Sequence, residues 1–156
     1  MYRNILLAYD GSEAGQRALL ESQNISQWSD ARLTLAAVIF ADTDSFGLGV
    51  EYSGAFRVFQ ETKRNCQRLL DIGVSNLTSR GFRATGSLLS GNVVGEIVNH
   101  ASAIHADLIV VGHRREKNWA RRWWCRSTSH SLVEVAQCSV LMLVISDRLQ
   151  QRDLTG

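Results

Sequence analysis

Residues 107–127 have the sequence DLIVVGHRREKNWARRWWCRS, in which a short apolar run ends at a glycine and opens into a basic, tryptophan-rich segment. We interpret residues 107–111 as a strand buried on both faces and the segment after Gly112 as a loop that precedes a helix. Ligands of open α/β sheets bind at such junctions, outside the carboxyl end of a strand. This stretch therefore predicts both a fold class and the place to look for a site.

The rest of the chain repeats this alternation of apolar runs and amphipathic segments. Further strands are predicted at residues 5–9, 33–40, 82–89 and 140–145. The run at 82–89 alternates in polarity, so we expect it nearer an edge of the sheet. Helices are predicted at residues 13–28, 56–77, 92–104 and 127–136, with a loop at 42–54. This alternation predicts a single, doubly wound α/β domain with a parallel sheet and helices on both faces.

Composition limits the class of protein. The 156 residues, 45% hydrophobic and 21% charged, fit one globular domain with a core of its own. The apolar run near the N-terminus is too short for a signal peptide or a membrane span, so we expect a cytoplasmic protein without membrane insertion. Three cysteines, Cys66, Cys125 and Cys138, are too widely spaced to indicate a disulfide framework or a zinc site.

Residues 114–126 carry six basic side chains against Glu116 alone, a net charge of +5 in a chain of net charge +2. Three of the four tryptophans, Trp119, Trp123 and Trp124, lie in the same segment. A nucleic-acid surface is disfavoured because no extended basic stripe accompanies this segment. An anionic membrane surface or a protein partner fits the charge, but we favour a partly helical lid whose tryptophans pack on the sheet edge.

Three segments in order resemble the universal stress protein family: ILLAYDGSEAGQRAL, SGNVVGEIVNHASAIHADLIVVG and VEVAQCSVLMLV. The resemblance spans about residues 3 to 146, which implies a domain at 1–146 and a polar tail at 147–156. It also implies a five-stranded parallel sheet of order 3-2-1-4-5 and a homodimer formed through the last strand, residues 140–145. Many family members bind ATP, so ATP with Mg²⁺ is the cofactor that the resemblance suggests.

The family's phosphate loop has the form G-x2-G-x9-G-[ST], because glycines let backbone amides approach phosphates. By resemblance, Asp10 lies near the adenine or ribose, Val38 beside the adenine, Gly112 begins the loop, and Ser127 is its terminal serine. The second glycine position is Arg115 in this chain, and the third is Arg126, or Cys125 if the spacing is kept. Side chains there predict that tight ATP binding is lost, unless the arginines contact phosphates themselves.

Several residues carry both a structural and a functional interpretation. Ser12 caps a predicted helix, and Gly91 with Asn92 begins another, so both places suit a ligand contact or a plain turn. His113 follows Gly112 and either meets an anion or serves as a loop histidine bonded to backbone. The four histidines, His100, His105, His113 and His130, have no metal-ligand spacing, so no metal site is expected.

These observations favour a non-enzymatic, cytoplasmic stress-response module. Motifs of nucleophilic or P-loop catalysis are absent from the sequence, and at most slow hydrolysis is expected if ATP binds. One alternative is an adenine-nucleotide binder, using ATP or AMP, with loop arginines on the phosphates. Its site residues are Asp10, Ser12, Val38, Gly91, Gly112, His113, Arg115, Arg126 and Ser127. The other alternative is a protein that docks an anion or partner through residues 114–126.

Overall fold

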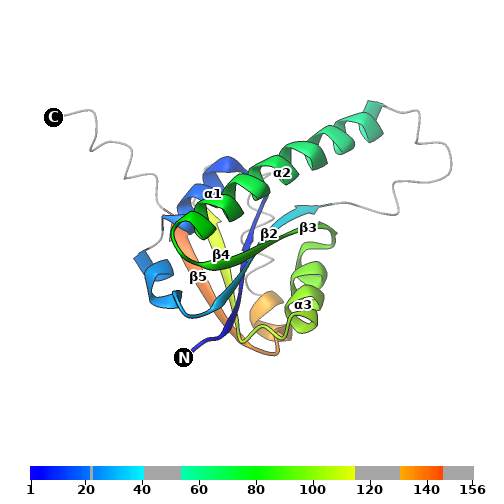
Figure 1. Cartoon of the computed structure of the whole chain (residues 1–156). Coiled ribbons are helices and arrows are strands. Elements are labelled where there is room, and N and C mark those ends of the chain that lie inside the picture. Colours follow the sequence, from blue (N-terminus) through cyan, green and yellow to red (C-terminus); the bar gives the residue numbers. More distant parts are fainter. Residues whose placement is uncertain (22, 41–53, 115–130, 146–156) are drawn as a thin grey trace, which may run out of the picture.

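The computed structural model describes residues 1–21, 23–40, 54–114 and 131–145 (Figure 1). Its strands are β1 (Asn4–Tyr9), β2 (Arg32–Phe40), β3 (Arg83–Gly91), β4 (Leu108–Arg114) and β5 (Ser139–Ile145). Its helices are α1 (Glu13–Leu20), a 3₁₀ helix at Gln23–Trp28, α2 (Gly54–Ser79) and α3 (Val93–Ala103). Residues 131–135 are also helical. Most of the predicted loop at 42–54 and the tail at 147–156 lie outside the described residues.

The five strands form one sheet of order β3-β2-β1-β4-β5 in which every neighbouring pair is parallel. The predicted doubly wound topology is therefore confirmed. β1 lies in the middle, where Ile5 is level with Leu33 of β2 and Leu108 of β4. β3 lies at an edge, in agreement with its alternating polarity.

Hydrophobic side chains cover both faces of the sheet, because successive residues of a strand point to opposite sides. On one face, Ile5 and Leu7 of β1 belong to a cluster with Leu70 and Leu77 of α2. On the other face, Leu6 and Ala8 belong to a cluster that includes Ile97 of α3 and Leu132. α1 and α2 thus lie on one side of the sheet, and α3 with residues 131–135 on the other (Figure 1). β1 is buried on both sides, which explains its uninterrupted apolar sequence.

The predicted boundaries of two elements were wrong. The first helix was expected to run to Trp28, but α1 ends at Leu20 and a separate 3₁₀ helix places Ile25 and Trp28 in the core. Asn24 and Ser26 of the 3₁₀ helix are weak α-helix formers, which agrees with this break. The fourth strand was expected to end near Gly112, but β4 continues to Arg114 because β5 offers partners as far as Ile145.

The start of α3 differs from the prediction in its details. Gly91 ends β3 instead of opening the helix, and Asn92 is the N-cap, accepting the Gly95 amide at 3.0 Å. Val93 is buried with Ile97 and Ala101, whereas Val94, which was expected to face inward, is partly buried against the same cluster.

Candidate functional site

The carboxyl ends of the parallel strands bring several predicted residues to one edge of the sheet. Asp10 directly follows β1 and is exposed. Val111 of β4 is level with Ala8 of β1, so Gly112 reaches the level of the end of β1. Phe40 at the end of β2 is level with Gly91 at the end of β3. Asp10 and Gly112 are thus on adjacent strands, while Gly91 is two strands, about 10 Å, from β1.

The turn after β1 is built by Asp10, Gly11 and Ser12. One carboxylate oxygen of Asp10 accepts the Ser12 amide at 3.0 Å and the Ser12 hydroxyl at 2.5 Å. The Ser12 Oγ in turn accepts the Gly15 amide at 3.0 Å and caps α1. Gly11 has φ +76°, a conformation that suits glycine. Asp10 and Ser12 therefore hold the chain reversal between β1 and α1, with the carboxylate at the surface.

Next to this turn lies a buried polar contact that was not predicted from the sequence. The Gln16 side-chain amide of α1 donates to the Tyr9 hydroxyl at 2.8 Å and to the Leu69 carbonyl of α2 at 2.7 Å. Burial raises the pKa of the Tyr9 phenol to about 12. Gln16 lies three residues before the inward-facing Leu19, so its helical spacing was the available signal.

Cys66 of α2 packs directly under the turn. Its thiol donates to the Gly11 carbonyl at 3.5 Å, and a Cβ at position 11 would lie 2.7 Å from its sulfur. Burial raises the pKa of this thiol, with a further contribution from Asp10. The thiol is therefore a packing group at neutral pH.

The remaining predicted site residues differ in burial and in the elements to which they belong. Val38 is 1% exposed and packs with Val93 and Ile97 beneath α3. Gly91 is buried with φ +146°, and a Cβ there would lie 3.0 Å from a carboxylate oxygen of Glu96. His113, which we expected in the loop, belongs to β4. Arg115, Arg126 and Ser127 lie outside the described residues. The structure thus brings Asp10, Ser12 and Gly112 together and leaves Val38 covered.

Among the described residues, His, Cys, Asp and Glu side chains do not gather in any group of three or more that could hold a metal ion. Within the same residues, none of the helices has both the length and the hydropathy needed to cross a bilayer.

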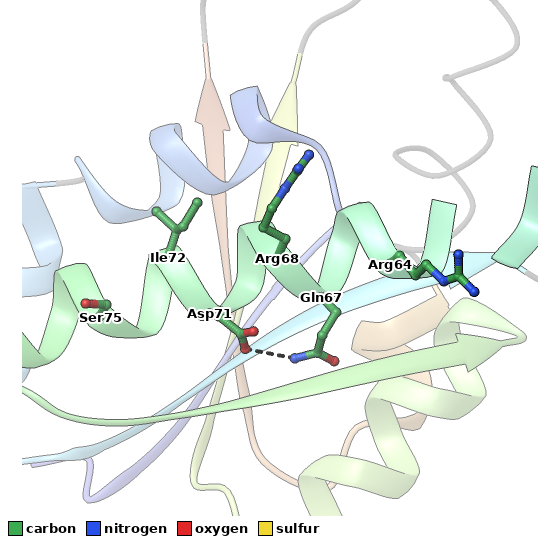
Figure 2. Close-up of a pocket in the computed structure, with 6 residues that line it drawn as sticks. All are labelled: Arg64, Gln67, Arg68, Asp71, Ile72 and Ser75. Atoms are coloured by element: carbon green, nitrogen blue, oxygen red, sulfur yellow. Dashed lines mark hydrogen bonds between the residues drawn. The ribbon is translucent and has the colours of Figure 1, made fainter. Parts of the chain in front are cut away.

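A hollow of about 610 Å³ lies on the outward face of α2 (Figure 2). Arg64, Gln67, Arg68, Asp71, Ile72 and Ser75 line it, and every one of them is exposed. Gln67 donates to Asp71 at 2.9 Å, a bond along the helix surface. Because all these side chains come from one helix and do not converge on a common point, we regard the hollow as surface relief.

Comparison with known proteins identifies the family. The family model of universal stress proteins matches residues 1–143. The chain belongs to the universal stress protein family. A putative universal stress protein of Staphylococcus aureus (strain USA300) is 29% identical over 144 residues, which cover 91% of this chain and 84% of the relative.

Solved structures of universal stress proteins share the fold. The protein UspA from Lactobacillus plantarum superposes with a TM-score of 0.73 at 23% identity, covering 91% of this chain and 97% of that one. A universal stress protein solved in complex with cAMP gives a TM-score of 0.65 at 21% identity, covering 93% and 99% of the two chains. At these identities the likeness establishes the fold of this universal stress protein, which agrees with the parallel sheet described above.

Proposed function

We propose that this universal stress protein is a non-catalytic, cytoplasmic, regulatory or protective binding module that does not hold ATP tightly. The observation that carries the proposal is the course of β4 beyond Gly112. His113 is level with Val144 of β5 and Arg114 with Ile145, so the backbone stays extended in a ladder. A backbone in a strand ladder is not curled around a phosphate, and the family's second glycine position is then occupied by Arg115.

The environment of the other candidate residues supports the same proposal. Asp10 binds its own turn through one carboxylate oxygen, and Val38 is covered by α3. Both residues are therefore explained by folding alone. Thermal unfolding with excess ATP and Mg²⁺ tests the proposal, because a ligand that binds only the folded state raises Tm. We expect no shift with nucleotide, and a shift that saturates would contradict it.

The second candidate function is adenine-nucleotide binding, which the cAMP complex of a family member favours. In this alternative Asp10, Val38, Gly112 and Ser127 form the site, and the arginines of residues 114–126 contact the phosphates. Asp10 and Gly112 stand on adjacent strands at the edge where such ligands bind in open α/β sheets.

A double variant distinguishes whether the arginine side chains exclude a nucleotide or bind its phosphates. If the side chains at positions 115 and 126 are what exclude a triphosphate, Arg115→Gly with Arg126→Gly should raise nucleotide affinity by about tenfold or more. If the arginines instead bind the phosphates, the same change should weaken binding. The two outcomes are compared by titration at fixed ionic strength, with Arg57→Gly/Arg64→Gly on α2 as the charge-matched control.

We also propose that the protein is a homodimer that pairs through β5. β5 lies at an edge of the sheet, its sequence SVLMLVI has no charged residue, and Val140, Leu141, Met142 and Leu143 are half-buried. Apolar edge strands are usually covered, because their free backbone groups otherwise invite aggregation. Light scattering after size exclusion should give about twice the 17.4 kDa chain mass. A monomer would contradict this proposal.

A further inference from the structure

A second hollow lies on the α3 side of the sheet, between α3 and residues 136–138, near the start of β4. Its volume is about 390 Å³, within the range of small-molecule sites. Ile109, the second residue of β4, and Cys138, just before β5, place it toward the amino ends of these strands. Asp10 and Gly112 lie at the opposite edge, so this hollow is separate from the edge considered above.

The inner wall of the hollow is apolar and is formed by three alanines together with Val98 and Ile109. Ala101 and Ile109 are 5% and 1% exposed, so they form a dry base. Ala106 and Ala136 line its sides. A larger side chain at either alanine position would occupy the hollow. Because the apolar base is left uncovered, it favours a ligand with a flat, apolar body.

The outer rim carries three uncharged polar side chains: Asn99, Ser102 and Gln137. All three are exposed, and within the described part of the chain their side chains form no hydrogen bond with a protein neighbour. Asn99 and Gln137 each offer one carbonyl acceptor and two N–H donors. The rim therefore matches a ligand edge that combines a donor with an acceptor, such as an amide.

Charge is nearly absent from this wall. No Lys, Arg, Asp or Glu is among the described residues that line it, and His105 is its titratable ring. Burial raises the pKa of the Cys138 thiol, so the thiol is neutral. The neighbouring Asp107 carboxylate accepts the amides of Arg3 and Asn4 at 2.7 and 3.0 Å, and its negative charge also raises the pKa of the Cys138 thiol. An anionic ligand would lose hydration without gaining a counter-charge from the described lining residues.

We propose that this hollow is a binding site for a small, uncharged, planar ring that carries an amide edge. The ring lies on the base formed by Ala101 and Ile109, and the amide exchanges hydrogen bonds with Asn99 and Gln137. The site is independent of the strand edge that the proposed function concerns, so its test stands whether or not nucleotide binds.

Nicotinamide is the probe, followed by two-dimensional amide NMR of the full chain. We expect saturable shifts of the Ser102 and Gln137 backbone amides and of the Asn99 and Gln137 side-chain amides. A probe of this size should bind with a Kd on the order of 1 mM. Nicotinate, which has the same ring with a carboxylate in place of the amide, should bind at least about tenfold more weakly.

Two leucine substitutions provide the matched pair. Ala136→Leu places a side chain in the hollow and should weaken nicotinamide binding by at least about tenfold. Ala103→Leu, at an exposed position of α3 that does not line the hollow, should leave it unchanged. Should Ala136→Leu fail to fold, Gln137→Leu removes a rim amide at an exposed position and should weaken binding severalfold.

The proposal is overturned by non-saturating shifts, by equal binding of nicotinamide and nicotinate, or by equal affinities of the folded Ala136→Leu and Ala103→Leu proteins. Shifts confined to Asp10 and Gly112 would also overturn it, because the probe would then sit at the opposite edge of the sheet.

Discussion

At the scale of single residues, the turn after β1 depends on Gly11 for two separate reasons. Its φ of +76° disfavours a side chain, and the Cys66 sulfur would lie 2.7 Å from a Cβ. Gly81 has a similar φ of +89°, but nothing lies within 4 Å of its Cβ position. A substitution at Gly81 therefore tests backbone strain alone, whereas one at Gly11 tests backbone strain together with crowding by Cys66.

Gly81→Ala should cost about 1 kcal/mol of unfolding free energy, which is the cost of the backbone conformation. Gly11→Ala should cost more, because Cys66 must also move. Adding Cys66→Ala to Gly11→Ala should remove this additional cost. Urea denaturation of the unchanged protein, Gly11→Ala, Cys66→Ala and the double variant measures the coupling between the two positions. Equal costs at positions 11 and 81, with no coupling to Cys66, would show that the contact does not matter.

Tyr9 makes stability depend on pH at the alkaline end. Its pKa is raised from 10.0 to about 12, mainly by burial, so the folded state holds the phenolic proton more tightly than the unfolded state does. The stabilisation is therefore complete below pH about 10 and is lost as the pH rises toward 12. Tyr9→Phe should flatten this part of the curve of unfolding free energy against pH. An unchanged slope in that variant would assign the loss to other groups.

The sequence predicted this turn only in part. The local sequence Asp10-Gly11-Ser12 predicts a turn and a helix cap, and the structure has both. The bond from Gln16 to Leu69 joins residues 53 positions apart, so no local pattern contains it. Val38 was assigned to a ligand by resemblance, and its burial under α3 depends on packing between distant segments.

At the scale of elements, Gln16 connects three of them. It lies on α1 and bonds the last residue of β1 and a carbonyl of α2. A Cβ at Gly73 of α2 would lie 2.6 Å from the Gln16 amide nitrogen, so the close approach of the two helices leaves no space for another side chain. The bonds of Gln16 thus fix how α1 and α2 pack on the sheet.

Gln16→Leu should lower the free energy of unfolding by about 1–3 kcal/mol, because the buried Tyr9 hydroxyl and Leu69 carbonyl lose their partner. Gln67→Leu, which removes an exposed bond to Asp71 on α2, should change it by no more than about 0.5 kcal/mol. Chemical denaturation compares the two proteins. Similar values for both would mean that water satisfies the groups that Gln16 leaves.

Element types followed from the sequence better than element ends. Apolar runs and helical spacing are local signals, and they located all five strands. The end of β4 was missed because it depends on how far β5 extends beside it. The end of α1 was missed because Ile25 and Trp28 keep apolar spacing while the backbone changes to a 3₁₀ helix.

At the scale of the whole molecule, the sheet order places the carboxyl ends of β1 and β4 side by side in this universal stress protein. Residues 115–126, which follow β4, carry a net charge of +4 in a chain of net charge +2, and they have arginines or cysteine where the family has glycines. Sequence and fold together therefore predict where a ligand would bind and why a triphosphate is disfavoured. The hollow beside α3 was not predictable, because it depends on how α3 packs beside residues 136–138, which are distant in sequence.

The most direct test of the central claim is a calorimetric titration of the purified protein with ATP and Mg²⁺, after absorbance has shown that no nucleotide copurified. We expect no binding heat at micromolar affinity, a result that would place the function in the dimer surface, the basic segment or the hollow beside α3. A Kd in the micromolar range, about −8 kcal/mol, would contradict it and would mean that arginine side chains replace the lost glycines on the phosphates.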